Sequence, residues 1–330
     1  MAKDEKASKK LLLKLKLKAW WNGYDAEEVE KRYLKGLPKT ESTQKSKAKP
    51  PVTVDPTSPF AIKPWDKESL DIAQFIWGKG YCGPGGPEYI VALSKLLAMS
   101  PEMSMVDVGC NIGGASRTLA ERFGIWVTGL EENAEMAEVG QELSKMAGME
   151  KKAQIQSVDF NELEAFDRKY DRAIARESLF NIEDKKKVLT ATEEALKPGG
   201  LMLVTDYVLG DEGVVMRDSF KEWKVGERST PYCVMPVDYE EMFKDLKMQV
   251  RVSEDISKEY ITLINRAWAG AEKVAAKLAK EEDGPHKIQI LMREAEFWTR
   301  RKKMLSSGEL RLWRIVANKK AGTPSMMSDW

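Results

Sequence analysis

The sequence predicts an α/β fold, a Rossmann-like, doubly wound sheet of seven strands whose last strand is antiparallel. Three observations predict it. Short apolar strands alternate with helical stretches between residues 104 and 207, a glycine-rich turn follows the first strand, and the alternation ends in a mostly helical insertion at 211–305. A basic arm precedes this body at the amino terminus.

The elements follow in a regular order. Apolar runs predict strands at 104–109, 125–131, 153–159, 171–177 and 201–207. Helical stretches lie at 115–123, 133–148 and 184–196. This order predicts parallel strands joined by right-handed crossovers. Further on, we expect an irregular then helical segment at 211–247, a strand at 249–255, helices over 257–304 and a final strand at 309–320.

The amino-terminal arm, residues 1–35, contains the run KKLLLKLKLKAWWNGY. Leucines and tryptophans recur at helical spacing, but LKLKLK also alternates as a strand would. Residues 1–50 carry 14 Lys+Arg and 7 Asp+Glu, a net charge of +7, whereas the rest carries −6. The arm is therefore expected to have one of two roles. It is a helix that docks on the body or on a second subunit, or it is a helix that lies on the surface of an anionic membrane.

Residues 36–59 are rich in Pro, Ser, Thr and Lys and predict a flexible linker, so one domain is expected over 60–330. No apolar run has the length of a membrane span. Three scattered cysteines predict neither a disulfide framework nor a zinc site, and favour a reducing cytoplasm. The single histidine, His286, lies in an expected loop, and we expect no metal.

The turn MVDVGCNIGG carries the first chemical signal. A dinucleotide-binding turn requires a glycine where this chain has Asn111, and no GK[ST] follows to make a P-loop. S-adenosylmethionine has no pyrophosphate and fits this turn better. Its expected contacts are an acid in the first strand, two glycines of the turn, an acid for the ribose 22 positions beyond Gly109, and a pair for the adenine: Asp107, Gly109, Gly113, Glu131, Asp159 and Phe160.

The pattern resembles class I S-adenosylmethionine-dependent methyltransferases. The segments FIWGKGYCGPGG, YDRAIARESLFNIEDK, KPGGLMLVTDY, FKEW and RLWRIVANKK are similar to phosphoethanolamine N-methyltransferases, from about Lys63 to Lys320. The resemblance implies that the cofactor is held by Tyr81, Gly109, Glu131, Asp159, Phe160 and Arg176. It also implies that the substrate phosphate is gripped by Tyr207, Arg228, Tyr232 and Arg301, the last replacing a lysine of the family.

The catalytic pair departs from that family. A tyrosine and a histidine are replaced by Trp65 and Asn181, and the loop acid is Glu177 instead of aspartate. We take these three residues as the catalytic candidates. Glu177 is placed to accept a proton from an amine, Asn181 to hydrogen-bond the substrate, and Trp65 to face a methylated ammonium.

The sequence therefore predicts methyl transfer to an amine of a small anionic substrate or lipid precursor. Methylation of carbon, oxygen or sulfur on a lipid, isoprenoid or small acid is the alternative, and a module that binds S-adenosylmethionine without catalysis is a third hypothesis. Asn111 disfavours a nicotinamide dehydrogenase. A nucleic-acid partner is not expected, because the body is acidic and ARES stands beside the fourth strand where a DPPY-like motif would lie. The oligomeric state stays open.

Overall fold

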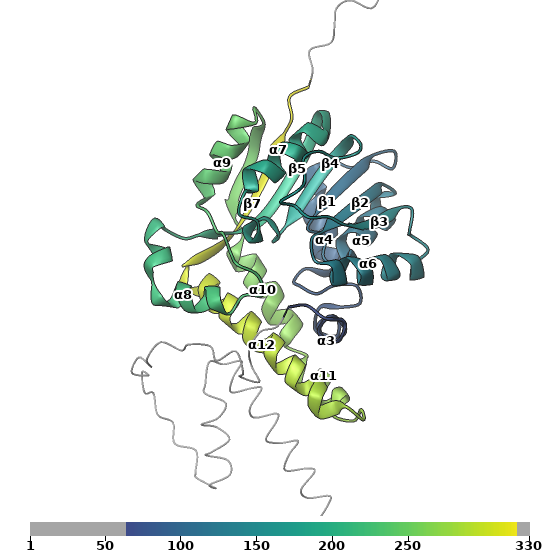
Figure 1. Cartoon of the computed structure of the whole chain (residues 1–330), viewed down its shortest axis with the longest axis vertical. Helices are drawn as coiled ribbons and strands as arrows, with labels where there is room; N and C mark the ends of the chain where they lie inside the picture. Colours follow the sequence, from purple (N-terminus) through teal and green to yellow (C-terminus); the bar gives the residue numbers. More distant parts are fainter. Residues whose placement is uncertain (1–63, 322–330) are drawn as a thin grey trace, which may run out of the picture.

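In the computed structural model, residues 64–321 are described, so the predicted arm and linker lie outside them. The strands are β1 (Ser104–Val108), β2 (Trp126–Glu131), β3 (Ala153–Ser157), β4 (Tyr170–Arg176), β5 (Leu196–Leu209), β6 (Gln249–Asp255) and β7 (Leu310–Asn318). They form one sheet in the order β3-β2-β1-β4-β5-β7-β6. The last strand, β7, is antiparallel to both β5 and β6, and the other pairings are parallel, which confirms the predicted fold (Figure 1).

Both faces of the sheet are covered. The helices α5 (Gly114–Phe123) and α6 (Ala134–Met146) join the first strands, whereas α7 (Lys185–Ala195) and α9 (Pro236–Asp245) lead into β5 and β6. Met105 of β1 belongs to the core that includes α5 and α6, and Val106 and Val108 belong to the core that includes α7 and α9. Alternate residues of one strand thus enter opposite layers, as expected for a sheet buried on both faces.

Two helices that the sequence interpretation left unassigned precede β1, namely α3 (Lys67–Trp77) and α4 (Gly86–Ser94). Asp66 begins α3, where its carboxylate accepts a hydrogen bond from the Ser69 backbone N–H at 2.7 Å. The glycine-rich segment between the two helices approaches α5 closely. A Cβ at Gly114 would lie 2.2 Å from the Gly80 carbonyl oxygen, so this crossing depends on glycine.

The predicted insertion at 211–305 separates into two parts. Strand β6 extends the sheet, with α9 packed against it. The second part of the insertion is helical. It consists of the short helix η3 (Glu212–Met216) and the helices α8 (Asp218–Val225), α10 (Ser257–Trp268), α11 (Ala271–Leu278) and α12 (Gly284–Ser307). Figure 1 shows α8, α10, α11 and α12 gathered with α3 at one end of the sheet, and α12 contacts each of the other four.

The loop predicted around His286 is instead the first turn of α12, where Pro285 is suited to an early helical position. The half-exposed ring of His286 bonds to Glu68 of α3 at 2.9 Å, so it bridges two surface helices. Within residues 64–321, no helix combines the length and the apolar character needed to cross a membrane.

Candidate active site

The glycine turn after β1 fixes an acidic side chain of the neighbouring strand. The backbone N–H groups of Gly109 and Cys110 donate to the Leu130 carbonyl, at 2.8 and 2.9 Å. Asn111 adopts a left-handed conformation (φ 54°), and its N–H donates to one carboxylate oxygen of Glu131 at 2.7 Å. The N–H of Asn133 donates to the other oxygen at 3.0 Å. Burial raises the pKa of Glu131 to about 7, while these two bonds oppose that shift.

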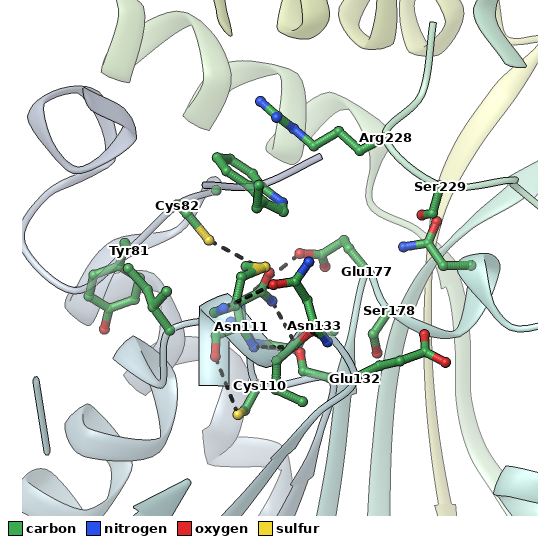
Figure 2. Close-up of a pocket in the computed structure, with 18 of the residues that line it drawn as sticks. Tyr81, Cys82, Cys110, Asn111, Glu132, Asn133, Glu177, Ser178, Arg228 and Ser229 are labelled. Carbon is green, nitrogen blue, oxygen red and sulfur yellow. Dashed lines mark hydrogen bonds and ion pairs between the residues drawn. The ribbon is translucent and has the colours of Figure 1, made fainter. Parts of the chain in front are cut away.

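A cavity of about 370 Å³ opens beside this turn (Figure 2). It lies at the carboxyl ends of the strands, where doubly wound sheets bind their ligands. Ten of the predicted site residues line it: Trp65, Tyr81, Gly109, Glu131, Phe160, Arg176, Glu177, Asn181, Arg228 and Arg301. In Figure 2, the turn at Cys110 and Asn111 lies near the centre, and Arg228 and Ser229 lie above it and to the right.

Five predicted residues are not among those that line the cavity in the described part of the chain. Asp107 is buried beneath the turn and accepts a 2.7 Å bond from Ser116, and Gly113 begins α5 with φ 72°. The Asp159 carboxylate accepts from the Asn161 backbone at 2.8 Å. Tyr207 is buried, and the Tyr232 ring has lysines beside it. Direct substrate contact by Tyr207 and Tyr232 stays a prediction.

Glu177 occupies the first position after β4 in a strained, left-handed conformation (φ 47°). Its carboxylate accepts a 2.6 Å bond from the Thr205 hydroxyl and lies 4.0 Å from the guanidinium of Arg176. Burial raises the pKa of Glu177, and the positive charge of Arg176 counteracts that effect. A backbone held in this region at a cavity edge is typical of a residue placed for chemistry rather than for packing.

A pair of buried tyrosines continues from Glu177 into the protein. Tyr260 of α10 lines the cavity, and its hydroxyl lowers the pKa of Glu177, opposing the effect of burial. Tyr207 of β5 donates to the Tyr260 hydroxyl at 3.3 Å. Tyr207 therefore contacts the cavity lining through Tyr260 and Arg301. The sequence interpretation missed Tyr260 because α10 lies more than fifty positions further along the chain.

Asn181 ends the short helix η2 (Leu179–Asn181) and lines the cavity. Its side-chain oxygen is buried and has no hydrogen-bond partner among the described residues. A buried, unsatisfied acceptor is costly unless a ligand or water supplies a donor. Asn181 is therefore positioned to accept a hydrogen bond from a bound molecule.

The two predicted anion-binding arginines are each paired with a buried glutamate. Arg301 donates through Nε and Nη2 to Glu227, at 3.1 and 2.5 Å, and Arg228 forms an ion pair with Glu294. The guanidinium of Arg228 also lies 3.6 Å from the centroid of the Trp65 ring. The face of Trp65 that was predicted to meet a methylated ammonium therefore contacts an arginine of the protein itself.

Sequence reasoning missed several further lining residues, such as Cys82, Asn133, Ser178, Phe297 and Trp298. Asn133 had a recognisable signal, because it follows a strand and begins α6 as its N-cap. The aromatic residues Phe297 and Trp298 of α12 had no recognisable signal, since the surrounding sequence is typical of any amphipathic helix.

Comparison with known proteins identifies the domain. A family model described as a methyltransferase domain matches residues 99–267, about half of the chain. The chain belongs to this methyltransferase family. Membership confirms the predicted class, an S-adenosylmethionine-dependent methyltransferase domain near the phosphoethanolamine N-methyltransferases, and it favours an enzyme over a module that only binds the cofactor.

Several relatives are similar to part of this methyltransferase. Phosphoethanolamine N-methyltransferase 3 of Arabidopsis thaliana is 25% identical over 199 residues, 60% of this chain and 39% of that protein. Sterol 24-C-methyltransferase of Yarrowia lipolytica is 29% identical over 120 residues, 36% of this chain and 32% of that protein. The chain thus spans about two fifths of the length of the first of these relatives.

A solved structure shares the fold. Haemonchus contortus phosphoethanolamine N-methyltransferase 2, in complex with phosphomonomethylethanolamine and S-adenosylhomocysteine, has a TM-score of 0.66 and 23% identity. The likeness covers 77% of this chain and 58% of that one. At this identity the likeness establishes the fold, and the acceptor must be argued from the residues of this chain.

Proposed function

We propose that this domain transfers the methyl group of S-adenosylmethionine to an amine of a small, acid-bearing substrate or lipid precursor. The observation that carries the proposal is the position of Glu177. Its carboxylate lines the cavity at the end of β4, it is kept there by a strained backbone, and its pKa is raised by burial. These properties suit a group that takes a proton from an ammonium.

The cofactor half of the cavity has donors and acceptors that fit S-adenosylmethionine. The Glu131 carboxylate would accept the ribose hydroxyls, and the Phe160 ring would stack on the adenine. The Nε of Arg176 is buried and has no hydrogen-bond partner among residues 64–321, so it is a candidate donor to the amino-acid carboxylate. Within this half, Gly109 gives the turn its left-handed backbone (φ 70°).

The acceptor half lies between Glu177 and the two arginines. When bound, the cofactor supplies an electrophilic methyl carbon on a sulfonium sulfur. Glu177 would take one proton from the substrate ammonium, which frees the nitrogen lone pair, and Asn181 would accept a second N–H bond. The rest of the rate enhancement comes from holding the amine in line with the methyl group, which needs no further acid or base.

Methylation of a carbon in an apolar acceptor is the second candidate. It is supported by the similarity to sterol 24-C-methyltransferase and by the aromatic wall of Trp65, Phe297 and Trp298. A carbon acceptor would carry no ammonium, so Glu177 would have no proton to accept before the transfer.

The experiment is methyl transfer from labelled S-adenosylmethionine to a panel of acceptors, with products identified by mass spectrometry. The panel contains 2-aminoethanesulfonate, β-alanine, O-phosphoethanolamine, ethanolamine, phosphatidylethanolamine and a sterol. We expect the label on nitrogen, with strongly reduced turnover in Glu177→Gln. Label on carbon, or equal turnover in that variant, would refute the amine proposal.

A further inference from the structure

We propose that Glu227 and Glu294 are specificity-determining residues that act through the two arginines and limit the acid group of the acceptor to a single negative charge. The inference rests on the proposed function and narrows its substrate class. The site is expected to exclude a doubly charged phosphate monoester as a substrate. A carboxylate, a sulfonate or a phosphodiester stays among the accepted ones.

The first step is the geometry of Arg301. Its Nε and Nη2 both bond to the Glu227 carboxylate, so one of the edges of the guanidinium that could bind two phosphate oxygens is already used. Among the described residues, no hydrogen bond reaches its Nη1. Two N–H groups on Nη1 and one on Nη2 are thus left for an acceptor, so Glu227 restricts the site mainly by neutralising the charge of Arg301.

The second step is the rigidity of this arrangement. The Arg301 guanidinium carbon lies 4.3 Å from the centroid of the Phe297 ring and 5.0 Å from that of Tyr207. The side chain of Glu227 is 2% exposed, so solvent is a poor replacement for the arginine as its partner. A buried carboxylate that loses its partner is strongly disfavoured, so an incoming acid group must bind beside this intact pair.

The third step is the charge balance. Glu294 is also 2% exposed and pairs with Arg228 across 66 positions of the chain. Three arginines line the cavity, and each has a glutamate beside it, so these three pairs carry no net charge: Arg176 with Glu177, Arg228 with Glu294 and Arg301 with Glu227. A phosphate monoester carries about −1.5 to −2 at pH 7 and would bring that charge close to the buried carboxylates. A monoanion brings less negative charge close to these carboxylates and needs less positive charge to balance it.

The two glutamates lie behind the cavity wall. The arginines line the cavity, whereas Glu227 and Glu294 are not among the described lining residues. The glutamates therefore act on the substrate through the charge of the arginines rather than through contact. A glutamine at either position would keep most of the shape and a hydrogen bond to the arginine while removing the negative charge.

The test uses two acceptors with the same two-carbon amine and a tetrahedral acid: O-phosphoethanolamine, a dianion, and 2-aminoethanesulfonate, a monoanion. Binding of each to the full chain, saturated with S-adenosylhomocysteine, is measured by calorimetry at pH 7.5 in the native protein, Glu227→Gln and Glu294→Gln. We expect the native protein to prefer the sulfonate. Each variant should shift the ratio of affinities towards the phosphate at least about tenfold, because an arginine loses its buried counter-charge.

Glu296→Gln is the matched control. Glu296 also lies on α12 and pairs with an arginine, Arg300, at 3.2 Å, but it does not line the cavity and we expect no shift in the ratio. Affinity for S-adenosylhomocysteine checks that each variant is folded. A native preference for the phosphate, or an unchanged ratio in Glu227→Gln, would overturn the inference. Because binding is measured without turnover, absence of methyl transfer to any amine would count against the proposed function alone.

Discussion

Substitution of Gly109 by alanine tests how closely the turn after β1 is packed against the segment that carries Glu177. Gly109 has a φ of 70°, a region that side chains disfavour. A Cβ at this position would lie 2.2 Å from the Cβ of Ser178 and 2.6 Å from its Oγ. Ser178 cannot easily move away, since its hydroxyl donates to the Val108 carbonyl at 2.9 Å.

The expected magnitude has two parts. The left-handed conformation costs an alanine about 1–2 kcal/mol. The overlap with Ser178 adds about 1–3 kcal/mol, the usual range for overpacking a buried site. Gly109→Ala should therefore lower the free energy of unfolding by about 2–5 kcal/mol. Gly148→Ala is the control, because Gly148 has a φ of 68° but no atom within 4 Å of its Cβ position, so only the first part applies.

Urea unfolding of Gly109→Ala, Ser178→Gly and the double variant separates the two parts. In the double variant, removal of the Ser178 side chain should relieve the overlap and recover the stability that the overlap cost. The coupling energy between the two positions should therefore be about 1–3 kcal/mol. Affinity for S-adenosylmethionine should also fall in Gly109→Ala, since relief of the overlap displaces the turn. If Gly109→Ala were no more destabilising than Gly148→Ala, or if Ser178→Gly gave no rescue, this account of the turn would be refuted.

Three further outcomes are expected. Glu131→Gln should weaken binding of S-adenosylmethionine at least about tenfold, the loss expected for a charged hydrogen-bond acceptor, and an unchanged calorimetric affinity would contradict the ribose assignment. Glu177→Gln should reduce kcat by about 10²–10⁴ while leaving cofactor affinity nearly unchanged, and the native rate should fall as pH drops through the raised pKa of Glu177. Burial raises the pKa of Asp206 to about 7 from an ordinary 3.8, so its contribution to stability is present below pH 3.8 and is lost as pH rises towards 7. Asp206→Asn should remove that slope, up to about 1.4 kcal/mol per pH unit, and identical pH profiles of urea unfolding would refute it.

The sheet could be predicted because its signals are local. Each strand is a short apolar run, and the alternation with helices determines the topology by simple crossover rules. The positions of the expected cofactor residues could also be predicted. Gly109, Glu131 and Phe160 lie at or just beyond the ends of consecutive strands and therefore meet at one edge of the sheet. Chain position alone places such residues, whatever the details of side-chain packing.

The region before β1 was harder to assign. Helix α3 has an N-cap at Asp66 and buried residues at helical spacing, such as Leu70, Ala73 and Trp77. Eleven residues next to a proline-rich stretch offer a weak pattern, however, and packing against α12 supplies the stabilisation that the local sequence does not show.

The proposed acceptor half contains ion pairs between residues that are distant in sequence, so the sequence alone does not reveal its net charge. From sequence, Arg228 and Arg301 are two cations beside expected tyrosines and predict an anion site. Their buried partners, Glu227 and Glu294, lie 74 and 66 positions from the arginines that they neutralise, so no local pattern reveals the pairing. The same two arginines would form a strong phosphate site without those carboxylates and form a nearly neutral wall with them. Under the proposed function, the substrate class would therefore be determined by residues behind the cavity as much as by those that line it.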